Sequence, residues 1–287
     1  RFVFFTGKGG VGKTSLACAA AVLLADAGRR VLLVSTDPAS NIGQVFGQRF
    51  GNRITPIGSV PNADAIEIDP EAAAASYRES ILAPVRDLLP AIEVASITEQ
   101  LSGSCTTEIA SFNEFTRLLA DDSVSGGYDH VIFDTAPTGH TIRLMELPGE
   151  WSSFIDDGKG DASCLGPMAG LEKSRATYQR AVDRLADATI TRLVLVTRAQ
   201  PSALQEAART AGELARLGIT AQHLVVNAVL PQPGPDADPL ARAIAGREQT
   251  ALSQLPETLR PLTRTVIPLR ATTMVGVDAL RHLFAAE

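Results

Sequence analysis

The sequence has few of the features that mark secreted or membrane-spanning chains. It contains 3 cysteines in 287 residues, too few and too scattered for a disulfide scaffold. The most apolar run, residues 16–25, is much shorter than the roughly 20 residues that a bilayer-spanning helix needs. The N-terminus leads from Arg1 into an apolar strand pattern and a glycine loop, unlike a signal peptide. We therefore expect a cytoplasmic protein.

An excess of positive charge is also missing. The 26 basic and 32 acidic side chains give a formal net charge of -6. A large nucleic-acid-binding surface is normally basic, so we expect no nucleic-acid partner. A small anion held by backbone amides is still compatible with this charge. The composition, with 45% hydrophobic residues, is that of a globular chain long enough for one large domain.

Short apolar runs rich in β-branched residues alternate along the chain with helical patterns. The helical patterns include residues 13–27 and 202–217, each closed by a glycine. Such repeated strand–helix–strand units predict an α/β fold, with a mostly parallel twisted sheet and helices on both faces. The predicted strands are residues 2–5, 31–35, 65–68, 131–133, 193–197, 224–227 and 265–267.

Two long stretches contain helical sequence but no convincing strand. We expect residues 70–125 and 141–188 to be helical insertions in a single domain that spans residues 1–287. Residues 231–239 are rich in Pro, Gly and Asp and predict a surface loop. The chain starts without Met, and we expect it to be part of a longer protein.

Residues 7–14 match the phosphate-loop pattern G-x-x-x-x-G-K-[ST] between a predicted strand and a predicted helix. The glycines allow successive N–H groups to face one anion, and the helix N-terminus adds its positive dipole end. Lys13 supplies a charge for the β- and γ-phosphates of ATP, and Thr14 offers a hydroxyl to Mg²⁺. The predicted nucleotide-binding residues here are Gly7, Lys8, Gly9, Gly10, Val11, Gly12, Lys13, Thr14 and Ser15.

Two aspartates follow predicted strands whose carboxyl ends should meet the nucleotide. Asp37 comes just after the second strand and could orient the attacking water, although an aspartate in a turn or at a helix N-cap is common. Asp134 ends an apolar strand, as a carboxylate that serves Mg²⁺ does. The polar segment 135–140 after it could be ordered by the γ-phosphate. We predict Lys13, Asp37, Asp134 and Lys8 as catalytic residues, and Thr14, Asp37 and Asp134 around Mg²⁺.

The motifs taken together resemble one ATPase family. The phosphate loop, with its extra Lys8, resembles the deviant Walker A motif of a dimerising class of NTPases. Segments 7–14, 35–41 and 134–140 and two cysteine-containing segments, 101–108 and 162–168, resemble the arsenical pump-driving ATPases, most closely their N-terminal half. The likeness continues at 226–227 and 274–277 and so covers essentially the whole chain.

This resemblance implies a specific function. Members of the family have two homologous ATPase halves, hydrolyse ATP when As(III) or Sb(III) binds, and energise a membrane pump that exports arsenite, at the inner face of the membrane. In this chain Cys105, Cys164 and His140 match the metalloid-binding positions, and Asn227 matches a position that reads adenine. Lys8 would reach phosphate where two domains face each other. The remaining metalloid ligands belong to the other half, so the expected partner is a second half or a copy of this chain.

The chemistry of the cysteines is consistent with this resemblance. Trivalent arsenic and antimony are thiophilic, yet free cysteines are usually small buried hydrophobes, and we expect Cys18 to be one of these. A targeting factor for tail-anchored membrane proteins is the alternative function; it would need an apolar, often Met-rich groove, and the chain has 3 Met. A spatial-positioning ATPase would need a basic surface or an amphipathic tail, and a metal-cluster reductase could also use two cysteines.

Overall fold

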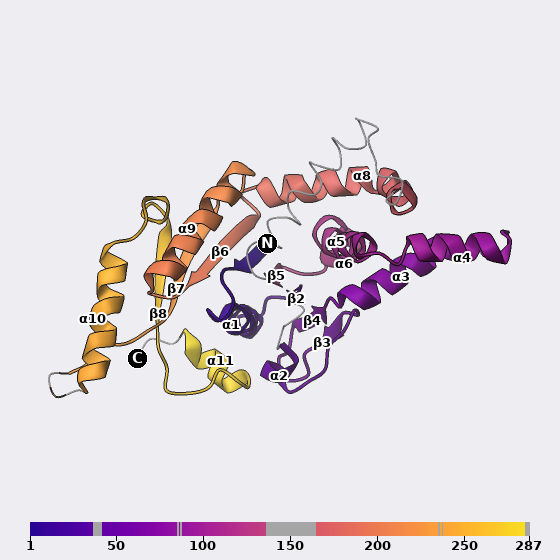
Figure 1. The fold of residues 1–287 in the computed structure, drawn as a ribbon. Coiled ribbons are helices and arrows are strands. Elements are labelled where there is room, and N and C mark those ends of the chain that lie inside the picture. The colour runs from indigo at the N-terminus through magenta and orange to yellow at the C-terminus, as the bar shows by residue number, and fades with distance from the viewer. Residues whose placement is uncertain are drawn as a thin grey trace.

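The computed structural model describes residues 1–36, 42–84, 86, 88–135, 165–234, 236 and 238–284. An eight-stranded sheet lies at its centre, and helices cover both of its faces (Figure 1). The predicted α/β fold is therefore confirmed. Neighbouring strands follow the order β3-β4-β2-β5-β1-β6-β7-β8, and β3 pairs with β4 as the one antiparallel pair of the described sheet.

The strands agree with the predicted apolar runs, with ends that differ by a few residues. Pairing with neighbours extends a strand beyond its most apolar residues, because the hydrogen-bond ladder continues past them. Sequence reasoning missed β3, a two-residue edge strand without an apolar pattern. The strands are β1 (Phe2–Thr6), β2 (Val31–Ser35), β3 (Thr55–Pro56), β4 (Ala63–Glu67), β5 (His130–Asp134), β6 (Thr191–Thr197), β7 (Gln222–Val229) and β8 (Thr263–Pro268).

One face of the sheet is covered by small and aliphatic side chains. Helix α1 (Lys13–Asp26) packs there with α2 (Ile42–Phe46) and α11 (Val277–Leu283). Alanines at 17, 19, 21 and 25 of α1 are buried, so the helix backbone can approach the sheet closely. The expected helix at residues 13–27 is thus α1, and it ends at Asp26 before Gly28, whose φ is 77°.

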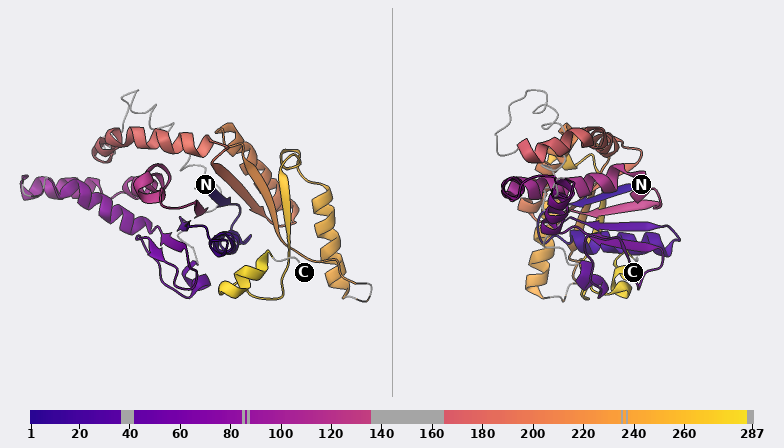
Figure 2. Two further views of the ribbon diagram at one scale, coloured as in Figure 1. Left: turned by 180° about the vertical axis from the view of Figure 1, so that it is seen from behind. Right: turned by 90° about the vertical axis from the view of Figure 1, so that its right-hand side faces the viewer.

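The opposite face contains most of the aromatic core. Phe4 stacks on Phe133 with ring centroids 4.4 Å apart, and Phe115 packs against both rings. This face is covered by α5 (Ser104–Ala120), α8 (Leu165–Ala186) and α9 (Pro201–Arg216), with α6 (Asp122–Ser125) beside them. Figure 2 shows these helices on one side of the sheet and α11 on the other.

Two helices extend away from the sheet. Helix α3 (Pro70–Leu82) is capped by Asp69, whose carboxylate accepts hydrogen bonds from the amides of Glu71 and Ala72, and α4 (Ala91–Gln100) follows it. No residue of α4 is buried, and the pair projects as an arm in Figure 1. The chain ends with α10 (Pro239–Ser253), a short 3₁₀ helix η2 (Glu257–Leu259), β8 and α11.

Where the insertions were expected, most of the described residues are helical. Helices α3 to α6 occupy most of the first predicted stretch, and α8 covers residues 165–186 of the second. Residues 136–164 lie outside the described residues. Among the helices of the described residues, none is both long and apolar enough for a membrane span.

Candidate functional site

The loop between β1 and α1 has a shape that requires glycine at two positions. Gly7 has φ 146°, and a Cβ there would lie 2.1 Å from the carbonyl oxygen of Val196. Gly12 has φ 96°, and a Cβ there would lie 2.3 Å from Nδ2 of Asn227. Any larger residue would displace the loop from β6 or β7. The glycines of the phosphate-loop pattern are thus explained by close packing at the centre of the sheet.

The two lysines of the loop point in different directions. Lys13 is 5% exposed, and its Nζ donates to the carbonyl oxygen of Lys8 at 3.3 Å, so its ammonium group lies inside the curve of the loop. The Lys8 side chain is half exposed, and its Nζ lies 3.8 Å from Oε2 of Glu206 on α9. Lys13 is therefore placed to meet an anion held by the loop, and Lys8 lies at its outer side.

Thr14 and Asp134 form a partly buried oxygen pair beside the loop. The Thr14 hydroxyl donates to Oδ2 of Asp134 at 2.7 Å, and Asp134 is fully buried at the end of β5. The sheet sets its position, since Asp134 pairs in register with Phe5 and Ser35 on the two neighbouring strands. Hydroxyl and carboxylate oxygens are ligands that Mg²⁺ prefers, so this pair fits a magnesium ion bound with phosphate.

Two further hydroxyl groups at this edge of the sheet are buried. Neither Oγ1 of Thr6 nor Oγ of Ser35 has a hydrogen-bond partner within the described residues. They lie at the carboxyl ends of β1 and β2, beside the strand that carries Asp134. Buried polar groups are usually paired, so this edge has polar capacity that the chain's own described groups do not use.

Asn227 reaches the loop from β7. Its Nδ2 donates to the carbonyl oxygen of Val11 at 2.8 Å, across a sequence separation of 216 residues. This contact explains the tight space at Gly12 and joins the loop to the second strand on that side of β1. Asn227 is thus brought to the predicted nucleotide site, while its contact with adenine stays a prediction.

Cys18 lies in the core, as its reading as a buried hydrophobe predicted. It is fully buried on α1. Burial raises the pKa of its thiol well above the usual range, and the negative charge of Asp134 raises it further. A thiol that stays protonated is a poor nucleophile and a poor metal ligand. The surroundings of Cys18 therefore give no support for a role in metalloid binding.

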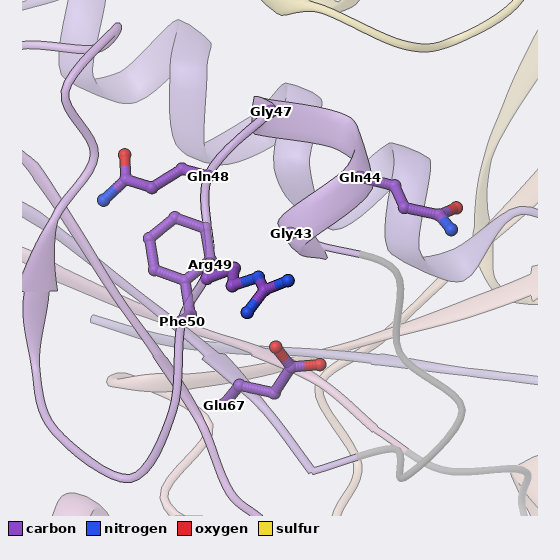
Figure 3. A pocket seen from close by; sticks show the side chains of 7 residues that line it. All are labelled: Gly43, Gln44, Gly47, Gln48, Arg49, Phe50 and Glu67. Carbon is purple, nitrogen blue, oxygen red and sulfur yellow. The ribbon is translucent and has the colours of Figure 1, made fainter.

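An open pocket of about 570 Å³ lies at the next part of this sheet edge (Figure 3). Glu67 and Arg49 point toward one another inside it, and partial burial raises the pKa of Glu67. Glu67 pairs in register with Ser35, so Glu67, Ser35 and Asp134 lie in one row across three strands. No phosphate-loop residue lines this pocket, whose walls are Gly43, Gln44, Gly47, Gln48, Arg49, Phe50 and Glu67.

Several predicted site residues lie outside the described residues. These are Asp37, His140 and Cys164; of Cys105, the position on α5 is described but its side chain is not. Within the described part of the chain, no group of three or more His, Cys, Asp or Glu side chains could hold a metal ion. The structure therefore brings Lys13, Thr14, Asp134 and Asn227 together at the loop, and it leaves Asp37 and the metalloid positions untested.

Sequence reasoning missed two contributors to the site. One is Glu206, which faces Lys8, and the other is the carbonyl group of Val196, which packs on Gly7. Glu206 lies within the predicted helix 202–217 and carries no motif. No local signal could have found either residue, because both contacts depend on which strands are neighbours in the sheet.

Comparison with known proteins identifies the family. The sequence model of the anion-transporting ATPases matches residues 1–286. The chain is 58% identical over 286 residues to an arsenical pump-driving ATPase of Acidiphilium multivorum and equally to one of Escherichia coli. Each match covers 100% of this chain and 49% of the relative, so the chain spans about half the length of these curated relatives.

A more distant group of relatives has a different name. An ATPase get3 of Aspergillus terreus is 30% identical over 304 residues, which cover 98% of this chain and 88% of that protein. The higher identity thus goes with proteins about twice as long as this chain, and the lower identity with proteins of similar length.

Proposed function

Because this chain belongs to the anion-transporting ATPase family, we propose that it is one ATP-hydrolysing half of an arsenite- and antimonite-stimulated ATPase. In this proposal, hydrolysis energises export of the metalloid through a membrane efflux pump. The identity of 58% to proteins named arsenical pump-driving ATPase supports this choice of substrate. The match to about half of each relative supports a second homologous half as partner, in the same chain or as a second copy.

One observation carries the ATPase part of the proposal. The buried Lys13 ammonium, the curled glycine loop and the Thr14–Asp134 oxygen pair all lie at the carboxyl ends of β1 and β5. In this arrangement the loop amides and Lys13 would hold the β- and γ-phosphates, and Thr14 and Asp134 would hold Mg²⁺ directly or through water. A bound Mg²⁺ supplies charge neutralisation at the phosphates.

The remaining roles rest on the motifs of the chain. Asp37 would orient the attacking water, and Asn227 would contact the adenine ring at the end of the loop that it already braces. Lys8, exposed at the outer side of the loop, is placed where a facing domain could present its phosphates. This arrangement would make hydrolysis depend on the pairing of two halves.

The metalloid part of the proposal rests on Cys105, Cys164 and His140. Thiolates bind As(III) and Sb(III) because these elements are soft and thiophilic. His140 lies six residues after Asp134 in the sequence, so a ligand at His140 could bias the same segment that senses the γ-phosphate. We further propose that the protein associates with the inner face of the membrane through the pump. The acidic balance gives no reason to add a nucleic-acid partner.

The alternative function, targeting of tail-anchored membrane proteins, is less favoured. The relatives named get3 are 30% identical to this chain, against 58% for the arsenical pump-driving ATPases. Capture of an isolated transmembrane helix by the purified protein would favour this alternative.

The proposal is tested by measuring ATP hydrolysis by the intact protein that carries this sequence, with and without antimonite. We expect Mg²⁺-dependent hydrolysis that antimonite stimulates, and we expect the Cys105→Ser variant to lose the stimulation while it keeps basal hydrolysis. Absence of stimulation in the wild-type protein would refute the metalloid part alone. Failure to bind any adenine nucleotide in the presence of Mg²⁺ would refute the whole proposal.

A further inference from the structure

The ion pair between Lys8 and Glu206 joins the phosphate loop to a helix beyond β6. The Nζ–Oε2 distance is 3.8 Å, and the side chains are 51% and 25% exposed. Among the hydrogen bonds of the described residues, Nζ of Lys13 donates only to the Lys8 carbonyl oxygen, within the loop itself. The two ammonium groups of one loop are thus separated, with Lys13 inside and Lys8 turned outward toward α9.

The position of Glu206 is fixed by the packing of its helix. The neighbouring residues Ala203, Leu204 and Ala207 are buried against the sheet, and Thr210, one turn later, donates to the Glu206 carbonyl oxygen at 3.0 Å. The helix therefore fixes the backbone that carries the Glu206 carboxylate, and the long, half-exposed Lys8 side chain reaches it. The Lys8 side chain thus points toward α9 because its ammonium group pairs with Glu206 on that helix.

A polyphosphate near the loop would compete with Glu206 for Lys8. An exposed ion pair contributes little to stability, since solvent screens it and two long side chains lose freedom in forming it. Phosphate oxygens carry more negative charge than one carboxylate and bind lysine strongly. The ion pair can hold Lys8 when no phosphate is within reach and can release it when one is.

We propose that Glu206 is a positioning residue, which holds the Lys8 ammonium away from the phosphate cradle until phosphate, from this half or from a facing half, takes it over. The inference rests on the proposed nucleotide binding by residues 7–14. It assigns to Glu206 a restraining effect: the ion pair stabilises the nucleotide-free state and lowers the apparent affinity for nucleotide. Removal of the carboxylate should therefore tighten nucleotide binding.

The test uses Glu206→Gln in the intact protein, with a fluorescent ATP analogue titrated in the presence of Mg²⁺ at low salt. We expect the Kd and the KM for ATP to fall by roughly two- to fivefold, the range that an exposed ion pair can supply. Glu206→Asp, which keeps the charge, should stay close to the wild-type Kd. At 1 M salt, where the screening length is about 3 Å, the difference between Glu206→Gln and wild type should nearly vanish.

A double-mutant cycle separates this role from a structural one. In a Lys8→Ala background, Glu206→Gln should leave the Kd unchanged, because the group that it restrains is gone. Glu213→Gln is the matched control: Glu213 lies on the same helix, 4.0 Å from Arg209, and should leave the Kd unchanged in either background.

The inference is overturned if Glu206→Gln weakens binding, leaves it unchanged, or tightens it equally in the Lys8→Ala background. These outcomes leave the proposed ATPase function intact, because they compare variants that still bind nucleotide. If the wild-type protein itself retains no nucleotide, the proposed function fails, and the inference fails with it.

Discussion

Near the amino ends of the strands, side-chain pairs join separate elements of the fold, whereas the buried hydroxyl groups at the carboxyl ends of β1 and β2 have no such pair among the described residues. Arg1 and Arg184 both contact Asp122, and the Tyr128 hydroxyl donates to Asp64 at 2.6 Å. At the other end, the Thr6 and Ser35 hydroxyls are buried without a partner among the described residues. The contacts near the amino ends thus join parts of the fold, and the carboxyl ends of β1 and β2 keep polar groups that the described residues do not use.

The largest expected effect at the carboxyl end comes from Lys13→Ala. Loss of the ammonium group that faces the phosphates should lower ATP hydrolysis by about 10²–10³-fold, the cost of removing one charge-stabilising donor. Thermal unfolding without nucleotide should change little by comparison. Steady-state hydrolysis and calorimetry of the same sample check both statements.

A matched change at the amino end should separate function from stability. Arg184→Ala removes a partly buried cation that pairs with Asp122 and not with the loop, and its rate of hydrolysis should match that of the wild type. Wild-type hydrolysis in Lys13→Ala would contradict the assignment of the phosphate site.

A second change should affect both function and stability. Gly12→Ala places a Cβ at φ 96°, where it meets Asn227, and should cost about 1–2 kcal/mol of unfolding free energy for the left-handed backbone alone. It should also weaken nucleotide binding, because the loop must move away from Asn227. Urea unfolding and nucleotide titration measure the two effects.

Gly246→Ala provides the control for Gly12→Ala. Gly246 lies in helix α10, where an added Cβ meets nothing within 4 Å. This substitution should be neutral or stabilising. Equal stability losses for the two variants would show that the phosphate loop is not held as tightly as the contacts indicate.

The smallest effect is expected at the amino end. Arg184 donates to the Leu119 carbonyl oxygen at 2.8 Å and to Asp122 at 2.7 Å, so Arg184→Ala should lower the unfolding free energy by about 1 kcal/mol. Arg209→Ala, which breaks a 4.0 Å pair with a more exposed arginine, should have a smaller effect.

Acid should reduce the effect of Arg184→Ala on stability, because that effect depends on an ionised Asp122 carboxylate. The Arg184 hydrogen bond is the largest cause that holds the pKa of Asp122 below its ordinary value of 3.8. A lowered folded-state pKa means that the unfolded state binds more protons as acid is added. The stabilisation is therefore present above pH 3.8 and is lost as pH falls through the folded-state pKa. Chemical denaturation at pH 7 and pH 3 should show the difference between variant and wild type becoming smaller in acid.

The sequence predicted the elements of the fold well wherever burial leaves a local pattern. Strands β1, β2 and β5 are continuous apolar runs because both faces of the sheet are covered. The phosphate loop and Asp134 could be predicted because a motif and a strand end place them. Strand β3 could not, since a two-residue edge pairing has no periodicity.

The long-range contacts around the phosphate loop could not be predicted from any short segment of the sequence. Asn227 bonds the Val11 carbonyl across 216 residues, and Glu206 faces Lys8 from a helix that follows β6. Both depend on β6 and β7 lying next to β1, a sheet order that no single segment encodes. Residue type predicted which groups could act, and long-range pairing determined which groups meet.

The central place of β1 has a consequence for motion. Its backbone is hydrogen-bonded to β5 on one side and β6 on the other along nearly its full length. Its amide hydrogens should therefore exchange with solvent only on global unfolding, more slowly than those of the exposed helix α4. A strand so firmly anchored makes the start of the phosphate loop a fixed reference point, and any displacement that follows hydrolysis must arise in parts of the molecule that β1 does not restrain.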